Sequence, residues 1–281
     1  MSSEKKLILG GAQIGQEYGL VRPTSFSTEE RIQELFDSAT AAGFTAIDTA
    51  RTYGQSEHLI GGHVWAGEVH TKLDEYAAPR TSLGASLDAL GVDRVDLLYL
   101  CHDATRVRDV SHEYWGAEID ALASGTLEFG VAVYPDQVTF PLLDFAEIQV
   151  IQIPFNILSS AGTRSRVREW DRAGKKVIAR SIFAQGYLLN SSVRTSNTKI
   201  AKSIDAFHEV SRALGMDPAE LAFRWTLSHP VIDGIILGIG ALDELQSVSH
   251  WMAEGSLRPE EFLFVESSLE ASRSDIDLRK L

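Results

Sequence analysis

An acid, a phenol, an amine and an imidazole lie at the ends of three successive apolar runs. Asp48 ends the first run, Tyr53 lies in the polar turn behind it, and Lys72 and His102 end the next two runs. A free tyrosine has a pKa of about 10, and a neighbouring lysine cation lowers that pKa because it favours the phenolate. An aspartate holds the lysine in place, and a histidine can orient a substrate oxygen. Such a set can protonate an oxygen while hydride arrives at its carbon, or catalyse the reverse oxidation.

Each of the four residues also has a structural interpretation when it is taken alone. Asp48 can cap a turn, Lys72 can be a solvated strand end, Tyr53 can fill a loop, and His102 can be a hydrogen-bonded structural histidine. These separate interpretations do not predict that all four side chains meet at one place. Whether they meet depends on the elements that position them.

Eight apolar runs alternate with amphipathic, helix-like stretches along the chain. The predicted strands span residues 7–13, 45–50, 69–73, 94–102, 126–133, 147–155, 175–183 and 231–240. The helices are predicted from a capping box at Ser27 and Glu30, from the SEHLIGG segment (56–62), over Leu83, Leu87 and Leu90, around 111–124, 137–145 and 163–173, from about 199, from an N-cap at Asp217 followed by Pro218, and from Asp243.

Apolar strands that alternate with helices indicate a parallel sheet buried on both faces. Eight such units in about 250 residues predict an α/β fold, a closed (β/α)8 TIM barrel, as a single domain over residues 1–281. An open doubly wound sheet is the alternative, but GGAQIG lacks the G-x-G-x-x-G spacing typical of that fold. In a barrel the site lies at the C-terminal ends of the strands, which is where Asp48, Lys72 and His102 are expected.

Composition restricts the class of ligand. The formal net charge of −13 disfavours binding to duplex nucleic acid, which needs a basic face. A single cysteine, Cys101, excludes a cysteine-based metal cluster, and no apolar run is long enough to span a membrane. We therefore expect a cytoplasmic protein that binds a small molecule, with no metal. The sequence does not indicate an oligomeric state.

Several longer segments carry a resemblance to one family. DTARTYGQSE (48–57), TKLD (71–74), GVDRVDLLYLCHD (91–103), DPAELAFRWTL (217–227) and GIILGIG (234–240) resemble the aldo-keto reductase superfamily. The resemblance implies Tyr53 as general acid or base, Lys72 as the group that tunes its pKa, Asp48 as partner of the lysine, and His102 as the group that orients the carbonyl. LGGAQIGQEYG (9–19) and RSIFAQGYLL (180–189) resemble a bacterial subgroup linked to carbohydrate or specialised-metabolite pathways.

The resemblance also implies a nicotinamide cofactor, NADP(H) or NAD(H). The residues expected to contact it are Gly11, Gln152, Arg180, Ser181, Phe183, Gly186, Gly238 and Gly240. Arg180 replaces the tyrosine that often stacks on the nicotinamide, and Ala132 and Val133 replace a Ser-Asn pair. The segment 238–250 contains no basic residue except His250, so NADP(H) and NAD(H) both stay open.

Aromatic residues near the predicted loops suggest a sugar face or a flat carbonyl compound as substrate. They are Tyr18, Tyr134 and Phe155, with Trp65, Trp115 and Tyr187 as further candidates, although each can equally fill space under a loop. The predicted function is an NAD(P)-dependent oxidoreductase that interconverts an aldehyde or ketone and an alcohol, with a small-molecule substrate. One alternative is a nucleotide-binding or regulatory protein of the same fold with little or no turnover. A second is an unrelated barrel enzyme in which Lys72 forms a Schiff base.

Overall fold

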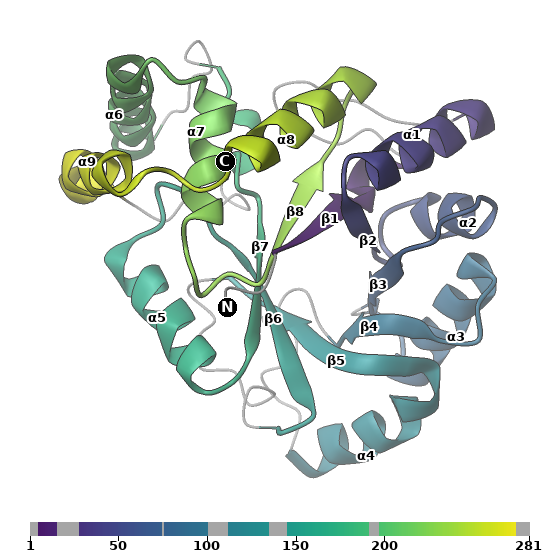
Figure 1. Cartoon of the computed structure of the whole chain (residues 1–281). Helices are drawn as coiled ribbons and strands as arrows, with labels where there is room; N and C mark the ends of the chain where they lie inside the picture. The colour runs from purple at the N-terminus through teal and green to yellow at the C-terminus, as the bar shows by residue number, and fades with distance from the viewer. Residues whose placement is uncertain are drawn as a thin grey trace.

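Eight parallel strands close into a barrel in a computed structural model of the chain (Figure 1). The structure describes residues 5–15, 28–74, 76–100, 112–134, 145–190 and 197–273. The strands are β1 (Lys6–Gly10), β2 (Phe44–Asp48), β3 (Glu68–Lys72), β4 (Val95–Tyr99), β5 (Thr126–Ala132), β6 (Ile148–Pro154), β7 (Lys176–Arg180) and β8 (Gly234–Gly238). Each strand pairs with the next, and β8 pairs with β1. The predicted (β/α)8 barrel is confirmed, and the open sheet is excluded.

The strands are buried on both faces, as their continuous apolar sequences predict. One set of side chains fills the barrel interior, and it consists of Ile8, Ala46, Leu97, Tyr99, Ala132, Val150, Ile178 and Ile236. Their neighbours along each strand point outward and join a larger core between the strands and the helices. This alternation decides which residues at the strand ends face the barrel mouth.

Helices surround the barrel (Figure 1). The α-helices of the described residues are α1 (Glu29–Ala41), α2 (Ser56–Gly61), α3 (Pro79–Leu90), α4 (His112–Leu122), α5 (Ala161–Arg172), α6 (Thr198–Leu214), α7 (Pro218–Leu227), α8 (Leu242–Glu254) and α9 (Pro259–Leu269). The helix predicted at 137–145 lies almost wholly outside the described residues. Helix α9 follows the eighth strand–helix unit and has no counterpart among the predicted elements.

The helix starts agree with the sequence patterns only in part. Asp217 caps α7 as predicted, since its side chain accepts hydrogen bonds from the amides of Ala219 and Glu220. The N-cap of α1 is Thr28, without a side-chain bond, and Ser27, on which the predicted capping box depends, lies outside the described residues. Helix α8 begins one residue before the expected Asp243, at Leu242.

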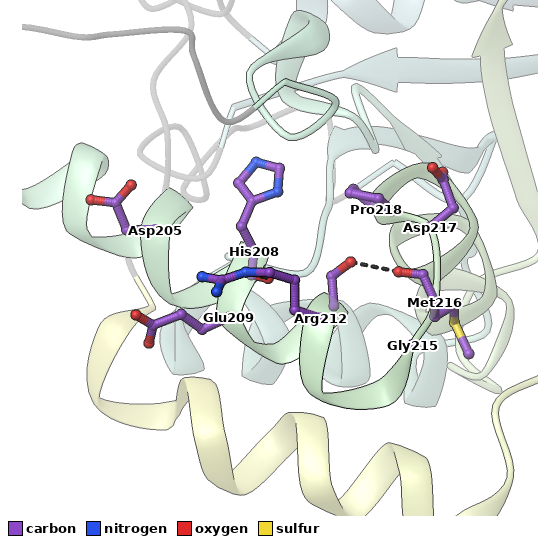
Figure 2. A pocket seen from close by; sticks show the side chains of 9 residues that line it. Asp205, His208, Glu209, Arg212, Gly215, Met216, Asp217 and Pro218 are labelled. Atoms are coloured by element: carbon purple, nitrogen blue, oxygen red, sulfur yellow. Dashed lines mark hydrogen bonds between the residues drawn. The ribbon is translucent and has the colours of Figure 1, made fainter.

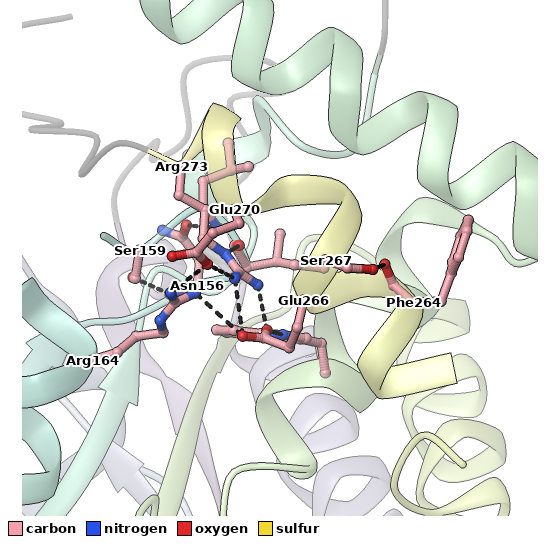
Figure 3. A network of polar contacts seen from close by, with 11 residues as sticks. Asn156, Ser159, Arg164, Phe264, Glu266, Ser267, Glu270 and Arg273 are labelled. Atoms are coloured by element: carbon pink, nitrogen blue, oxygen red, sulfur yellow. Dashed lines mark hydrogen bonds and ion pairs between the residues drawn. The ribbon is translucent and has the colours of Figure 1, made fainter. Parts of the chain in front are cut away.

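A polar network ties the end of α9 to the loop behind β6 (Figure 3). Arg273 donates from Nε to the carbonyl of Ile157 at 3.0 Å and forms an ion pair with Glu266. Arg164 of α5 pairs with Glu270 at 3.0 Å. The last described turn is thereby held against the same end of the barrel as the C-terminal ends of the strands.

Two features are absent from the part of the chain that the structure describes. No helix there has both the length and the apolar character that a membrane span requires. The same residues contain no cluster of histidine, cysteine and carboxylate side chains that could hold a metal ion.

Candidate active site

Three side chains from three strands form a buried polar cluster at the barrel mouth. Lys72, at the end of β3, donates from Nζ to Asp48 Oδ2 at 2.5 Å and to the carbonyl of Thr49 at 2.9 Å. Gln152 of β6 donates from Nε2 to the other carboxylate oxygen, Asp48 Oδ1, at 2.7 Å. Both carboxylate oxygens are therefore held, and the ion pair is oriented from two sides. The predicted partnership of Asp48 with Lys72 is present, whereas the contact of Gln152 with Asp48 was not anticipated.

Tyr53 lies beside this cluster on the turn between β2 and α2. The Tyr53 amide donates to the carbonyl of Ala50 at 3.0 Å, and Gly54 has a φ of 57°, a value that glycine adopts without strain. Lys72 Nζ lies 5.2 Å from the centroid of the tyrosine ring. The glycine behind the phenol thus allows the turn that places Tyr53, partly exposed, next to the buried amine.

The environment raises the pKa of Tyr53 well above its usual value. Burial is the largest cause, and the negative charge of Asp48 adds to it, while the nearby cation of Arg180 acts in the opposite direction. The net shift is therefore upward, and the role of Lys72 as the group that tunes this pKa stays a prediction. Lys72 is paired with Asp48 at 2.5 Å, so its charge acts on the phenol together with that of its partner.

Other residues of the DTARTYGQSE segment fix the turn from outside. Ser56 donates from Oγ to the carbonyl of Gly11 at 2.9 Å and shares a hydrogen bond of 2.8 Å with Thr49. Glu57 is 2% exposed, pairs with Arg51 at 2.5 Å and accepts a hydrogen bond from Thr71 at 2.6 Å. The serine and glutamate of the segment therefore position the turn that carries Tyr53. The sequence signal for this role was the presence of two polar residues, Ser56 and Glu57, directly behind the Tyr53 turn and between two predicted strands.

The loop behind β7 has an unusual backbone. Ser181, Ala184 and Gln185 have φ values of 56°, 47° and 54°, and they are the non-glycine residues with positive φ among those described. Such strained conformations concentrate at binding and catalytic sites. Successive amides in left-handed and right-handed conformations also form concave nests that bind anions. Ser181, Phe183 and Gly186 thus lie in a loop whose backbone suits the pyrophosphate of a dinucleotide.

Gln152 also suits a bound carboxamide. Its amide nitrogen is engaged by Asp48, and the Gln152 side chain also lies within hydrogen-bonding reach of Tyr99. Its buried Oε1 atom can accept a hydrogen bond from a donor. Ala132 and Val133 are fully buried apolar residues and offer no such group. Gln152 thus stays the predicted carboxamide contact among the described residues of the interior.

The glycines expected at the cofactor have tight surroundings. A Cβ on Gly238 would lie 2.5 Å from Gln13 Oε1, and one on Gly11 would lie 3.0 Å from the carbonyl of Asp48. The amide of Gly240 donates to Glu244 Oε2 at 2.8 Å. Gly11 therefore lies close to the backbone of β2, whereas the atom nearest to Gly238 is the end of the Gln13 side chain. A carboxylate already occupies the amide of Gly240.

The aromatic residues expected at the mouth divide into two groups. Tyr134 lies at the mouth, with the guanidinium carbon of Arg180 4.5 Å from its ring centroid. Phe155 is instead 1% exposed and stacks on Trp225 of α7 with ring centroids 5.4 Å apart. Trp115 and Tyr187 are likewise buried in the core outside the barrel. Phe155 is therefore a core residue, because it directly follows Pro154 at the end of β6 and packs outward against α7. His102 and Tyr18 lie outside the described residues.

A separate groove of about 860 Å³ lies between α6 and the start of α7 (Figure 2). Its lining includes Asp205, His208, Arg212 and Asp217. None of the lining residues belongs to the cluster around Lys72, so the groove is distinct from the barrel mouth.

The model of the Aldo/keto reductase family matches residues 6–270. The chain belongs to the aldo/keto reductase family. Its members interconvert carbonyl and alcohol groups with a nicotinamide cofactor, so the broad activity of this chain is oxidoreduction. The resemblance seen in the sequence motifs is confirmed.

Individual aldo/keto reductases are distant relatives. In an alignment 284 residues long, which covers 88% of this chain and 82% of the yeast enzyme, the chain is 24% identical to D-arabinose 1-dehydrogenase of Saccharomyces cerevisiae. The holo form of aldo-keto reductase AKR11C1 from Bacillus halodurans has a TM-score of 0.75, 18% identity and coverage of 96% of this chain and 94% of its own. Its apo form has a TM-score of 0.71, 18% identity and coverage of 89% and 90%. At these identities the solved structures support the fold.

Proposed function

We propose that this chain reduces an aldehyde or ketone, or oxidises the matching alcohol, with Tyr53 as general acid or base. The observation that carries the proposal is the buried Lys72–Asp48 pair, held by Gln152 and lying beside the partly exposed Tyr53. Structural stability alone does not require this arrangement, because burying an ion pair gives little net stability. His102 keeps its predicted role as the group that orients the carbonyl oxygen.

The raised pKa of Tyr53 suits the reductive direction. A nicotinamide cofactor supplies the hydride when it is bound. Tyr53 stays protonated at neutral pH, so its hydroxyl is available to protonate the oxygen of the substrate. Lys72 and Asp48 supply a fixed dipole beside the phenol, and Gln152 prevents Asp48 from rotating away.

A sugar-like substrate is part of this proposal. The yeast relative is a D-arabinose 1-dehydrogenase, and Tyr134 places an aromatic ring at the mouth that can cover one face of a sugar. Aldoses and short hydroxyaldehydes are therefore the first compounds to assay, together with simple aromatic aldehydes.

We also propose NAD(H) rather than NADP(H) as the preferred cofactor. The family resemblance places the adenosine ribose near the segment behind β8, where Asp243 and Glu244 lie in the first turn of α8 and Glu244 accepts from the amide of Gly240. A ribose phosphate there would meet carboxylates instead of basic partners. Fluorescence titration should give a lower Kd for NADH than for NADPH, and Glu244→Arg should narrow the difference. Tighter NADPH binding by the parent protein would refute the preference.

The test of the main proposal is turnover by Tyr53→Phe. With any substrate that the parent reduces, loss of the proton donor should lower kcat by about 100-fold to 10,000-fold while the circular dichroism spectrum stays unchanged. Tyr76→Phe is the matched control, because Tyr76 is 74% exposed and lies outside the cluster. Equal turnover of Tyr53→Phe and the parent would show that Tyr53 is not the proton donor.

A second candidate is a barrel that binds a nucleotide with little or no turnover. The buried Ala132 and Val133, which stand where the family has a polar pair, favour it. Reduction of a carbonyl compound by bound reduced cofactor would remove this candidate. A Schiff-base enzyme fits the structure less well, because the Lys72 amine is engaged by Asp48 and the Thr49 carbonyl.

A further inference from the structure

Arg180 ends β7 with its side chain on the inner side of the barrel. Ile178, two residues earlier, lies in the barrel interior, and side chains alternate along a strand, so Arg180 faces the mouth above it. Its backbone is fixed, since Arg180 is in register with Pro154 and its carbonyl accepts from the amide of Phe155 at 3.0 Å. The guanidinium is therefore held at the mouth by a rigid strand and not by a loop.

Arg180 differs from every other arginine that is buried or half-buried in the described residues. Each of the others has a carboxylate partner, and the pairs are Arg51–Glu57, Arg164–Glu270, Arg166–Glu169, Arg224–Glu220 and Arg273–Glu266. Arg180 is half-buried and has no carboxylate partner within the described ranges. A partly desolvated cation without a counter-charge is unfavourable unless a ligand supplies one.

The contact that Arg180 does make leaves its donors available. The guanidinium carbon lies over the ring of Tyr134, 4.5 Å from the centroid, which is a cation–π contact. The N–H groups point outward in the guanidinium plane, in a fork that matches a carboxylate or phosphate. Tyr134 thus orients the fork without satisfying it.

Arg180 also shares its surroundings with the candidate proton donor. Its positive charge lowers the pKa of Tyr53, against the larger effects of burial and Asp48, which raise it. Lys72, the other cation near Tyr53, already has a carboxylate partner in Asp48. Among the described groups at the mouth, Arg180 is thus the cation without a carboxylate partner that influences the pKa of Tyr53.

We propose that Arg180 binds the anionic group of the substrate, so that the chain prefers carbonyl compounds that carry a carboxylate or a phosphate. This inference rests on the proposed function, because it places the carbonyl at Tyr53 and the anion at Arg180. The net charge of −13 would otherwise repel such substrates, and a fixed cation at the mouth is the local feature that selects them. The pyrophosphate of a cofactor is the other source of an anion, and the backbone nest behind β7 already suits it.

The test compares substrates that differ in one charged group. The first pair is 4-carboxybenzaldehyde and its methyl ester, and the second is glyceraldehyde 3-phosphate and glyceraldehyde, which separates phosphate from carboxylate. The parent should favour the charged member of at least one pair in kcat/KM by tenfold or more. Arg180→Met should lower that ratio by about tenfold to a hundredfold, chiefly through KM, and Arg180→Lys should retain part of it. Arg166→Met removes the same charge from an outer helix and should leave the ratio unchanged.

Two further measurements make the outcomes distinct. If Arg180→Met lowers kcat/KM equally for both members of each pair and weakens cofactor binding in a fluorescence titration, the guanidinium serves the cofactor and the inference is wrong. If the parent reduces none of these compounds, the proposed function fails, and calorimetry with 4-(hydroxymethyl)benzoate and its methyl ester decides. Binding of the benzoate to the parent but not to Arg180→Met supports the inference without turnover, whereas equal binding of both compounds to the parent overturns it.

Discussion

Replacing Lys72 by methionine measures how much the buried ion pair between Lys72 and Asp48 contributes to the free energy of unfolding. Lys72 is 1% exposed and Asp48 is 4% exposed, and their charged atoms are 2.5 Å apart. Methionine has a similar length, so the change removes the charge and the donors with little loss of volume. Asp48 would then be a buried carboxylate with Gln152 as its remaining side-chain donor.

The expected cost follows from that uncompensated charge. Removing one partner of a buried ion pair typically costs about 3–5 kcal/mol, because the other charge stays desolvated. This is a large part of the roughly 5–15 kcal/mol by which a domain is stable. The free energy of unfolding of Lys72→Met should therefore fall by about 3–5 kcal/mol.

A second substitution separates charge from shape. Asp48→Asn in the Lys72→Met background removes the unpaired carboxylate and keeps an amide that can still contact Gln152, so more than half of the lost stability should return. Equilibrium unfolding in urea measures all three variants. Lys202→Met, on the exposed side of α6, is the control and should change stability by less than about 0.5 kcal/mol.

The result that refutes this reasoning is specific. A Lys72→Met variant within about 1 kcal/mol of the parent would show that water or a structural shift compensates Asp48. A double variant no more stable than Lys72→Met would show that the cost comes from lost side-chain contacts and not from charge.

Two further predictions concern the surrounding scaffold. Burial among aromatic rings lowers the pKa of His229 to about 3. Below a pH of about 6.5 the His229 side chain binds a proton in the unfolded chain but not in the folded chain. The free energy of unfolding should therefore fall by about 1.4 kcal/mol for each unit by which the pH is lowered in that range. Urea unfolding measures the free energy of unfolding at pH 6.5 and at pH 4.5. Between these two values His229→Gln should lose roughly 2–3 kcal/mol less than the parent, and an equal loss in both proteins would contradict the low pKa of His229. In the helices, a Cβ on Gly61 would lie 2.4 Å from the carbonyl of Ala89, whereas Gly84 has open space. Gly61→Ala should therefore lower Tm and Gly84→Ala should raise stability by about 0.5–1 kcal/mol, and a shift of the same sign in both would contradict this account.

The sequence by itself determined the order of elements and the strand ends. Apolar runs buried on both faces and alternating with amphipathic stretches are a local pattern, so all eight strands could be located from it. Asp217 followed by Pro218 is equally local, and it caps α7 as predicted. Because barrel sites lie at strand ends, the same pattern placed Asp48 and Lys72 at the mouth.

Tertiary structure decided which faces those residues present and which charges they meet. Phe155 was expected at the mouth, but the alternation of side chains that runs along β6 continues at this residue and turns it outward, against Trp225 in the outer core. The bond from Gln152 to Asp48 joins residues 104 positions apart, so no local pattern could reveal it. The pKa of Tyr53 rises for a related reason, since burial and the charge of Asp48 outweigh the opposing cation of Arg180. The sequence gives the type of each residue, but the burial of a side chain and the charges beside it are decided only when distant strands pair in the barrel.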